Sequence, residues 1–136
     1  MTARPRWSSW GYARVVQWLV AAQPHEGCAV GLGAAGRVRV WVRIANIDPR
    51  PHRFEMDPGE LAGALGAGAR FGLAPLVFVH SHVGGRPEPS ALDRSARWAG
   101  GLALWPSTWT LVQVVDGRNV GPRGLFPPAP AGGEGC

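Results

Sequence analysis

Two histidines, a serine and an aspartate stand close together between Val77 and Asp93 and could form a metal site. His80 and His82 are separated by one residue at the end of an apolar run, so both side chains point the same way on an extended strand. Asp93 comes one helical turn after Ser90, beyond a segment rich in glycine and proline. A catalytic zinc ion takes three protein ligands and leaves a fourth position for water. His80, His82 and Asp93 could supply those three ligands.

The same residues also fit a purely structural interpretation. Two histidines at the end of a buried strand can be ordinary core or loop residues. The segment from Ser90 to Asp93 is a plausible capping box, which starts a helix without any metal. Neither pattern alone identifies a metal site, and only their joint occurrence at this spacing favours one.

The stretch HSHVGGRPEPSALD as a whole resembles the JAMM motif of the MPN+ zinc metalloproteases, in which H-x-H, seven residues and S-x-x-D follow one another. That family also has a glutamate at the start of a strand after the first helix, in a context similar to P-x-E-x-C-G. Here the segment PHEGCAVG contains Glu26, and FEMDPGEL resembles the start of the second helix in small bacterial members. The resemblance extends from about Tyr12 to Phe126. It departs at Val83, where the family usually has proline.

The resemblance implies one zinc ion per chain with His80, His82 and Asp93 as its ligands. It further implies that Glu26 is the general acid/base and that Ser90 donates a hydrogen bond to the oxyanion. The implied reaction is hydrolysis of the peptide or isopeptide bond after the C-terminal Gly-Gly of a ubiquitin-like or sulfur-carrier protein of the ThiS/MoaD type. The alternative is a non-catalytic MPN scaffold that only binds partners, although no member of the ligand set is missing here.

The composition predicts one globular domain over residues 1–126 and a flexible tail over residues 127–136. Of the 136 residues, 46% are hydrophobic and 17% are charged, which is typical of a folded domain. All 14 basic residues are arginine and form no continuous run, so we expect no nucleic-acid partner despite the formal charge of +5. Two cysteines are too few for a disulfide framework and favour a reducing, cytoplasmic location. No membrane span is expected, and a homodimer is an open alternative to a monomer.

The hydrophobic patterns predict an α/β or α+β fold with one mixed sheet and about three helices. The resemblance narrows this fold to the MPN/cytidine-deaminase-like architecture, with zinc at a strand end. Alternating arginines in RVRVWVRI predict a strand with one exposed and one packed face. Predicted helices cover Tyr12–Ala22, Pro58–Gly72 and Ser90–Gly100, and predicted strands cover Cys28–Gly33, Arg37–Ile44, Leu76–His80 and Ser107–Gly117.

Several other residues have structural roles in this interpretation. Asp57 is the expected cap of the second helix, with Glu60 placed to complete a capping box. Cys28 is expected to be a small buried hydrophobe, and His25 and His52 are expected at the surface. The seven tryptophans are expected to serve packing rather than recognition.

Overall fold

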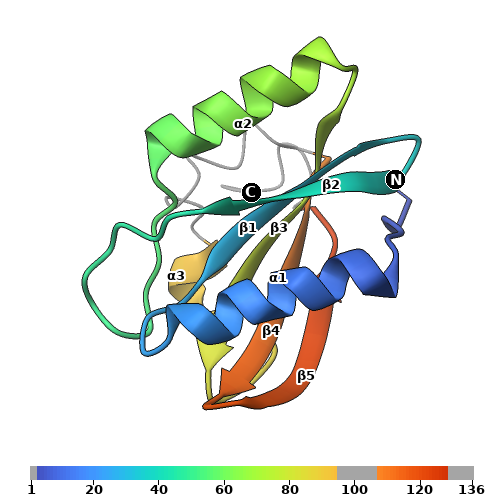
Figure 1. The fold of residues 1–136 in the computed structure, drawn as a ribbon. Helices are drawn as coiled ribbons and strands as arrows, with labels where there is room; N and C mark the ends of the chain where they lie inside the picture. Colours follow the sequence, from blue (N-terminus) through green and yellow to red (C-terminus); the bar gives the residue numbers. More distant parts are fainter. Residues whose placement is uncertain (1–2, 95–106, 129–136) are drawn as a thin grey trace, which may run out of the picture.

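The computed structural model describes residues 3–94 and 107–128 and contains one mixed β-sheet. Its elements are α1 (Ser9–Ala22), β1 (Cys28–Ala34), β2 (Arg37–Ile44), α2 (Pro58–Arg70), β3 (Ala74–Val83), α3 (Ala91–Arg94), β4 (Trp109–Asp116) and β5 (Asn119–Phe126). The five strands are ordered β2-β1-β3-β4-β5, with β3 and β4 parallel and the other neighbours antiparallel. Figure 1 shows α1 and α2 on opposite sides of β1 and β2. The predicted fold class is confirmed.

The two long helices begin at the residues that cap them. Ser8 caps α1 by accepting a hydrogen bond from a backbone N–H of the first turn, so this helix starts earlier than predicted. Asp57 caps α2 as predicted, because its Oδ1 accepts from the backbone N–H groups of Gly59 and Glu60. Pro58 occupies the first helical position, where the missing N–H costs nothing.

Glu60 does not complete the predicted capping box. Its Oε1 instead accepts a hydrogen bond from the backbone N–H of Ala45 at 2.9 Å. The backbone N–H of Asp57, which the box would have used, donates to the carbonyl of Ala45. Ala45, just after β2, therefore hydrogen-bonds to both of the groups that the capping box would have joined. These two hydrogen bonds hold the chain after β2 against the start of α2.

The strands alternate between two hydrophobic clusters, one against each long helix. On β3, Phe78 packs in the cluster beside α2, and Val79 packs in the cluster beside α1. The period of two along the strand then places His80 and His82 on the α2 face and Ser81 on the α1 face. Both histidines fall within β3, which is longer at each end than predicted.

Strand β2 departs from the predicted pattern of one exposed and one packed face. Val38 is buried in the cluster beside α1, whereas Ile44 is buried in the cluster beside α2. A register shift in β1 between Leu32 and Gly33 interrupts the pairing, and Val40 is left 41% exposed. Because the irregularity changes the phase of the alternation, β2 packs on both sides of the sheet.

Two parts of the C-terminal half differ from the sequence-based expectation. β5 pairs with β4 across the predicted Asp116-Gly117 turn, and its sequence NVGPRGLF has no alternation that would have indicated a strand. Its proline is tolerated because β5 is an edge strand. α3 covers only Ala91–Arg94, and the rest of the helix predicted to Gly100 lies outside the described residues. Trp98, Trp105 and residues 129–136 of the predicted tail lie outside them as well.

The described tryptophans have different roles, and the expectation of packing is wrong for one of them. Trp41 packs edge-on against Trp7 and Tyr12 on the α1 face. Gly31 lies directly below it, where a Cβ atom would come within 2.8 Å of the indole ring. Trp10, in contrast, is 78% exposed on α1. In the described ranges, no helix has the length and apolar character that crossing a membrane requires.

Candidate metal centre

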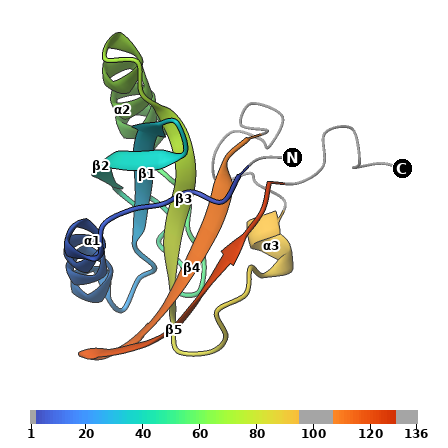
Figure 2. The ribbon, with the colours of Figure 1, turned by 90° about the vertical axis from the view of Figure 1, so that its right-hand side faces the viewer.

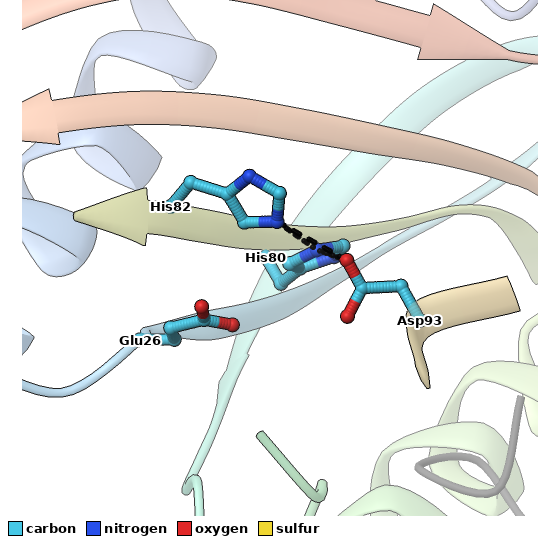
Figure 3. Close-up of side chains that lie close together, drawn as sticks. All are labelled: Glu26, His80, His82 and Asp93. Carbon is cyan, nitrogen blue, oxygen red and sulfur yellow. Dashed lines mark hydrogen bonds and ion pairs between the residues drawn. The ribbon is translucent and has the colours of Figure 1, made fainter. Parts of the chain in front are cut away.

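The structure brings together Glu26, His80, His82 and Asp93, which the sequence analysis singled out (Figure 3). One ligand atom from each lies within 4.8 Å of the others. Glu26 lies two residues before the start of β1, the two histidines lie near the end of β3, and Asp93 belongs to α3. Figure 2 shows α3 on the side of the sheet away from α1. Three segments that are distant in sequence thus meet at one end of the sheet.

Three of these side chains form a tight triangle of ligand atoms. Nε2 of His80 lies 2.9 Å from Oδ2 of Asp93, and Nε2 of His82 lies 3.1 Å from the same oxygen. The two Nε2 atoms are 3.3 Å apart. Ligand atoms on a tetrahedral zinc ion are separated by about 3.3 Å, given bonds of about 2.0–2.1 Å. The size and chemistry of the triangle therefore fit a zinc ion.

The tautomer of His82 supports the same assignment. Its Nδ1 lies 2.7 Å from the backbone carbonyl of Arg86, which can only accept, so Nδ1–H is the donor. In a neutral imidazole, Nε2 then presents a lone pair toward the lone pairs of the Asp93 carboxylate. Lone pairs that point at one another repel, and a cation placed between them would bind both. A carbonyl that fixes the tautomer of a ligand histidine is also typical of metal sites.

His80 is held in the hydrophobic cluster beside α2. Its imidazole is 1% exposed and stacks on the ring of Phe54, with centroids 4.2 Å apart. Burial lowers the pKa of His80, because the charged form loses solvation there, so the neutral, metal-binding form is favoured. Phe54 belongs to the loop before α2, and the sequence analysis missed it because no spacing links it to the motif.

Asp93 and Ser90 form the capping box that the sequence suggested, and Asp93 also belongs to the group that could hold a metal ion. The backbone N–H of Ser90 donates to Oδ2 of Asp93 at 2.8 Å, and the backbone N–H of Asp93 donates to Oγ of Ser90 at 3.1 Å. This is a reciprocal capping box at the start of α3. Burial acts to raise the pKa of Asp93, but hydrogen bonds from His80 and His82 outweigh it and lower the pKa well below its usual range. The carboxylate therefore stays ionised.

His82 is the more exposed of the two histidines. Burial lowers its pKa, but the hydrogen bond to Asp93 and the Arg86 carbonyl outweigh burial, and the net pKa is raised. The loop that carries Arg86 contains Gly84 and Gly85, both with positive φ values of 75° and 79°. Such a left-handed pair is readily formed by glycine alone and folds the chain back toward α3. The loop thus brings the start of α3 back to the end of β3.

Val83, the position that departs from the family pattern, is the last residue of β3. It pairs in register with Val115 of the parallel strand β4, and its side chain packs in the cluster beside α1. The next residue, Gly84, donates its backbone N–H to the carbonyl of Val115 at 2.8 Å. Valine therefore continues the sheet to the point where the loop begins.

Glu26 lies beside the triangle of ligand atoms but makes no hydrogen bond to it. It is 3% exposed, and its Oε1 has no hydrogen-bond partner among the described residues. Burial raises the pKa of Glu26 to about 7, with the negative charges of Asp93 and Asp48 adding to the effect against the attraction of His82. A carboxyl group with a pKa near neutrality can both accept and donate a proton at that pH.

Two polar side chains that the sequence analysis missed hold the backbone around Glu26. Ser81, between the two histidines, accepts a hydrogen bond at Oγ from the backbone N–H of Gly27 at 2.7 Å. Its own N–H donates to the carbonyl of Gly27 at 3.0 Å. Asn46 donates from Nδ2 to the carbonyl of Glu26 at 2.8 Å. The polar residue inside H-S-H was a signal for Ser81, because a buried hydroxyl requires a partner.

The other candidate ligands lie outside the group, as expected. Cys28 is 2% exposed in β1, and burial raises its pKa, so its thiol stays protonated. His25 and His52 are exposed. Neither Cys28 nor these histidines belong to the metal-binding group found in the described part of the chain.

Comparison with protein families gives a match to the prokaryotic homologues of the JAB domain over residues 11–121. The chain belongs to this family. The match includes all four clustered residues and most of the sheet. The resemblance to a small prokaryotic member of the JAMM/MPN+ family, which the sequence analysis described, is therefore confirmed.

Comparison with individual proteins gives further similarities. The chain is 32% identical over 101 residues to the desampylase of Pyrococcus furiosus, an alignment that covers 74% of this chain and 69% of that protein. A solution structure of a Desulfitobacterium hafniense protein is similar with a TM-score of 0.62 and 26% identity, covering 79% of this chain and 73% of the other. A Salinibacter ruber protein has a TM-score of 0.66 at 24% identity, with coverages of 95% and 85%, and supports the fold.

Proposed function

We propose that the protein is a zinc-dependent hydrolase of the JAMM type. Its substrate would be the peptide or isopeptide bond after the C-terminal Gly-Gly of a ubiquitin-like or sulfur-carrier protein. The observation that carries the proposal is the triangle of His80, His82 and Asp93 with the buried carboxyl group of Glu26 beside it. Similarity to a desampylase supports a hydrolase that acts on a ubiquitin-like modifier.

His80, His82 and Asp93 would hold the zinc ion through Nε2, Nε2 and a carboxylate oxygen. When bound, zinc supplies Lewis acidity and makes a water molecule nucleophilic near neutral pH. Burial favours the neutral ring of His80, and the Arg86 carbonyl fixes the tautomer of His82 that leaves Nε2 for the metal. The protein thus preorganises the ligands before substrate arrives.

Glu26 would move the proton in this reaction. Its carboxylate accepts the proton of the attacking water and then delivers it to the nitrogen of the departing amine. Ser90 would stabilise the oxyanion of the tetrahedral intermediate. Its Oγ already accepts from the backbone N–H of Asp93, so the hydroxyl proton is left for donation to substrate.

We further propose a cytoplasmic enzyme with one domain in residues 1–126 and one zinc ion per chain. The hydrophobic clusters on both faces of the sheet support a single domain, because each contains residues from distant elements of the described chain. A non-catalytic MPN scaffold would keep this fold and bind the same partners without cleaving them.

The test combines zinc content with cleavage of a MoaD-type carrier whose Gly-Gly end is fused to a reporter protein. We expect stoichiometric zinc and cleavage after Gly-Gly in the wild type. Glu26→Gln should keep the zinc and lose cleavage, because the amide cannot accept the proton. Glu55→Gln, at an exposed glutamate, is the matched control and should retain both.

Two results would contradict the proposal that the protein is an enzyme. Zinc-loaded wild type that binds the carrier fusion without cleaving it would indicate the scaffold. Purified protein that takes up no metal at any pH would remove the basis of the mechanism.

A further inference from the structure

The positive charge of the chain originates in its first third. Residues 1–47 contain six of the 14 arginines and one of the nine acidic residues, so they account for the whole formal excess of +5. The one acidic residue is Glu26, which is 3% exposed. The remaining residues contain equal numbers of arginine and acidic side chains. The excess therefore lies in the segment before α1, in α1 and in β2.

The fold places two arginine-bearing elements of this third side by side. α1 runs along the sheet next to the edge strand β2, as Figure 1 shows, and Tyr12 of α1 contacts Trp41 of β2. Arg14 on α1 and Arg43 on β2 are both exposed. Within the described residues, neither makes an ion pair with an acidic side chain. Their charges are therefore available to a partner.

Aromatic side chains accompany these arginines. Trp10, Arg14 and Trp18 follow one another at intervals of four residues on α1, so they form a stripe along one side of the helix. The guanidinium carbon of Arg14 lies 5.8 Å from the centroid of the Trp10 ring, and Trp10 is 78% exposed. Tryptophan and arginine are the residues most enriched among those that dominate binding energy in protein interfaces.

A hollow lies between this stripe and Glu26 of the candidate metal centre. It has a volume of about 370 Å³ and lies between the end of α1, the end of β2 and the start of α2. Trp18 and Arg43 line it from α1 and β2, and Glu26 lines it as well. A partner bound on α1 and β2 thus lies next to the proposed catalytic carboxyl group.

We propose that the α1–β2 surface, formed by Trp10, Arg14, Trp18 and Arg43, docks the folded body of an acidic protein substrate. The arginines would contact carboxylates of that body, and the hollow beside Trp18 would receive one of its side chains. This inference rests on the proposed function, since it names the substrate of the same site. The continuity of the surface with the hollow at Glu26 favours a protein over a nucleic acid, because the proposed reaction there acts on a peptide or isopeptide bond.

The experiment compares two reporter substrates that share one C-terminal segment. The first is a complete, acidic MoaD-type carrier fused through its Gly-Gly end to a fluorescent protein. The second is a short peptide that contains only the tail and the same scissile bond. The variants are Arg14→Glu and Arg43→Glu, and the matched control is Arg70→Glu, because Arg70 is exposed in the last turn of α2 across the sheet.

We expect Arg14→Glu and Arg43→Glu each to raise KM for the carrier fusion by about tenfold, with a clearly smaller effect on the tail peptide. The wild-type preference for the carrier over the peptide should shrink as salt rises from about 0.05 M to about 0.5 M, since screening weakens charge pairs at an exposed surface. Arg70→Glu should leave both substrates unaffected.

The possible failures are distinguishable. If the wild type does not cleave the tail peptide or the carrier fusion, the proposed function is wrong. If both are cleaved and Arg43→Glu changes the two KM values by equal factors, the docking surface is refuted while the function stands. If the reversals abolish binding of a labelled single-stranded oligonucleotide and leave carrier cleavage unchanged, the surface serves nucleic acid instead.

Discussion

The two faces of the sheet at the end of β3 differ in whether their polar groups have hydrogen-bond partners, although adjacent residues of the same strand lie on them. On the α2 face, His80 and His82 converge with Asp93, and Glu26 has an unpartnered buried oxygen among the described residues. On the α1 face, Ser81 is fully buried and exchanges two hydrogen bonds with Gly27. One face has polar groups still able to bind a ligand, and the other has groups already satisfied.

The difference shows how Glu26, the proposed proton carrier, can be positioned without hydrogen bonds from the described residues to its carboxylate oxygens. In the proposed mechanism the carboxyl group of Glu26 exchanges a proton with water and substrate, so hydrogen bonds to its oxygens would compete with that role. Its backbone is held instead, by Asn46 at its own carbonyl and by Ser81 at the next residue. Gly27 permits the close approach of α1, because a Cβ there would lie 3.0–3.2 Å from atoms of Leu19 and Ala22.

The largest effect should come from breaking the ligand triangle on the α2 face. Asp93→Asn removes the negative charge that the ion requires but can still accept the capping hydrogen bond from Ser90. We expect loss of stoichiometric zinc and a decrease in activity of about 10³-fold or more. Mass spectrometry of the metal content and the reporter assay measure both. Asp116→Asn, at an exposed aspartate that ends β4, serves as the control.

The next largest effect should follow from removing the Ser90 hydroxyl. Ser90→Ala deletes the proposed oxyanion donor, and the turnover rate should fall by about 10²–10³-fold with zinc retained. It also deletes the acceptor for the backbone N–H of Asp93. Ser90→Thr keeps both hydrogen-bonding roles and should restore most of the rate. A loss of zinc equal to the loss of activity would mean that Ser90 acts only as a helix cap.

A smaller effect should come from replacing Ser81, which lies on the α1 face of β3. Ser81→Ala leaves the buried N–H of Gly27 without its partner and should cost about 1–3 kcal/mol of stability. Because Glu26 would lose its alignment, kcat should fall about 10- to 100-fold at unchanged zinc content. Denaturant unfolding and steady-state kinetics measure the two effects. Ser81→Thr should rescue both, and an unchanged kcat in the destabilised alanine variant would limit Ser81 to a structural role.

The smallest effect should be the contribution of Glu26 to the pH dependence of stability in the metal-free protein. Its pKa is raised from 4.5 to about 7, so the folded state holds a proton that the unfolded state has released between these values. The free energy of unfolding should therefore fall as pH rises from about 4.5 to about 7. Comparing Glu26→Gln with the wild type isolates this contribution, since the amide does not titrate. Parallel pH profiles for the two proteins would show that Glu26 is solvated after all.

Local patterns were sufficient to predict most of the elements and the candidate ligands. The caps of α2 and α3 depend on contacts three residues apart, and Asp57 and Ser90 could be assigned from sequence for that reason. The shift of β2 between faces could not be predicted, because it arises from its pairing with Leu32 and Gly33 of β1. β5 was missed since an edge strand is stabilised by its neighbour rather than by its own pattern.

The sequence by itself determined the chemistry available to this protein. Residue types and spacing named His80, His82 and Asp93, because ligand identity and strand periodicity are local properties, and the family resemblance of the sequence added Glu26. Only the tertiary structure decided that Phe54 stacks on His80, that Ser81 holds Gly27, and that the charge excess of the first third lies beside the hollow at Glu26. These contacts join residues far apart in the chain, and packing of the whole sheet is what brings them together.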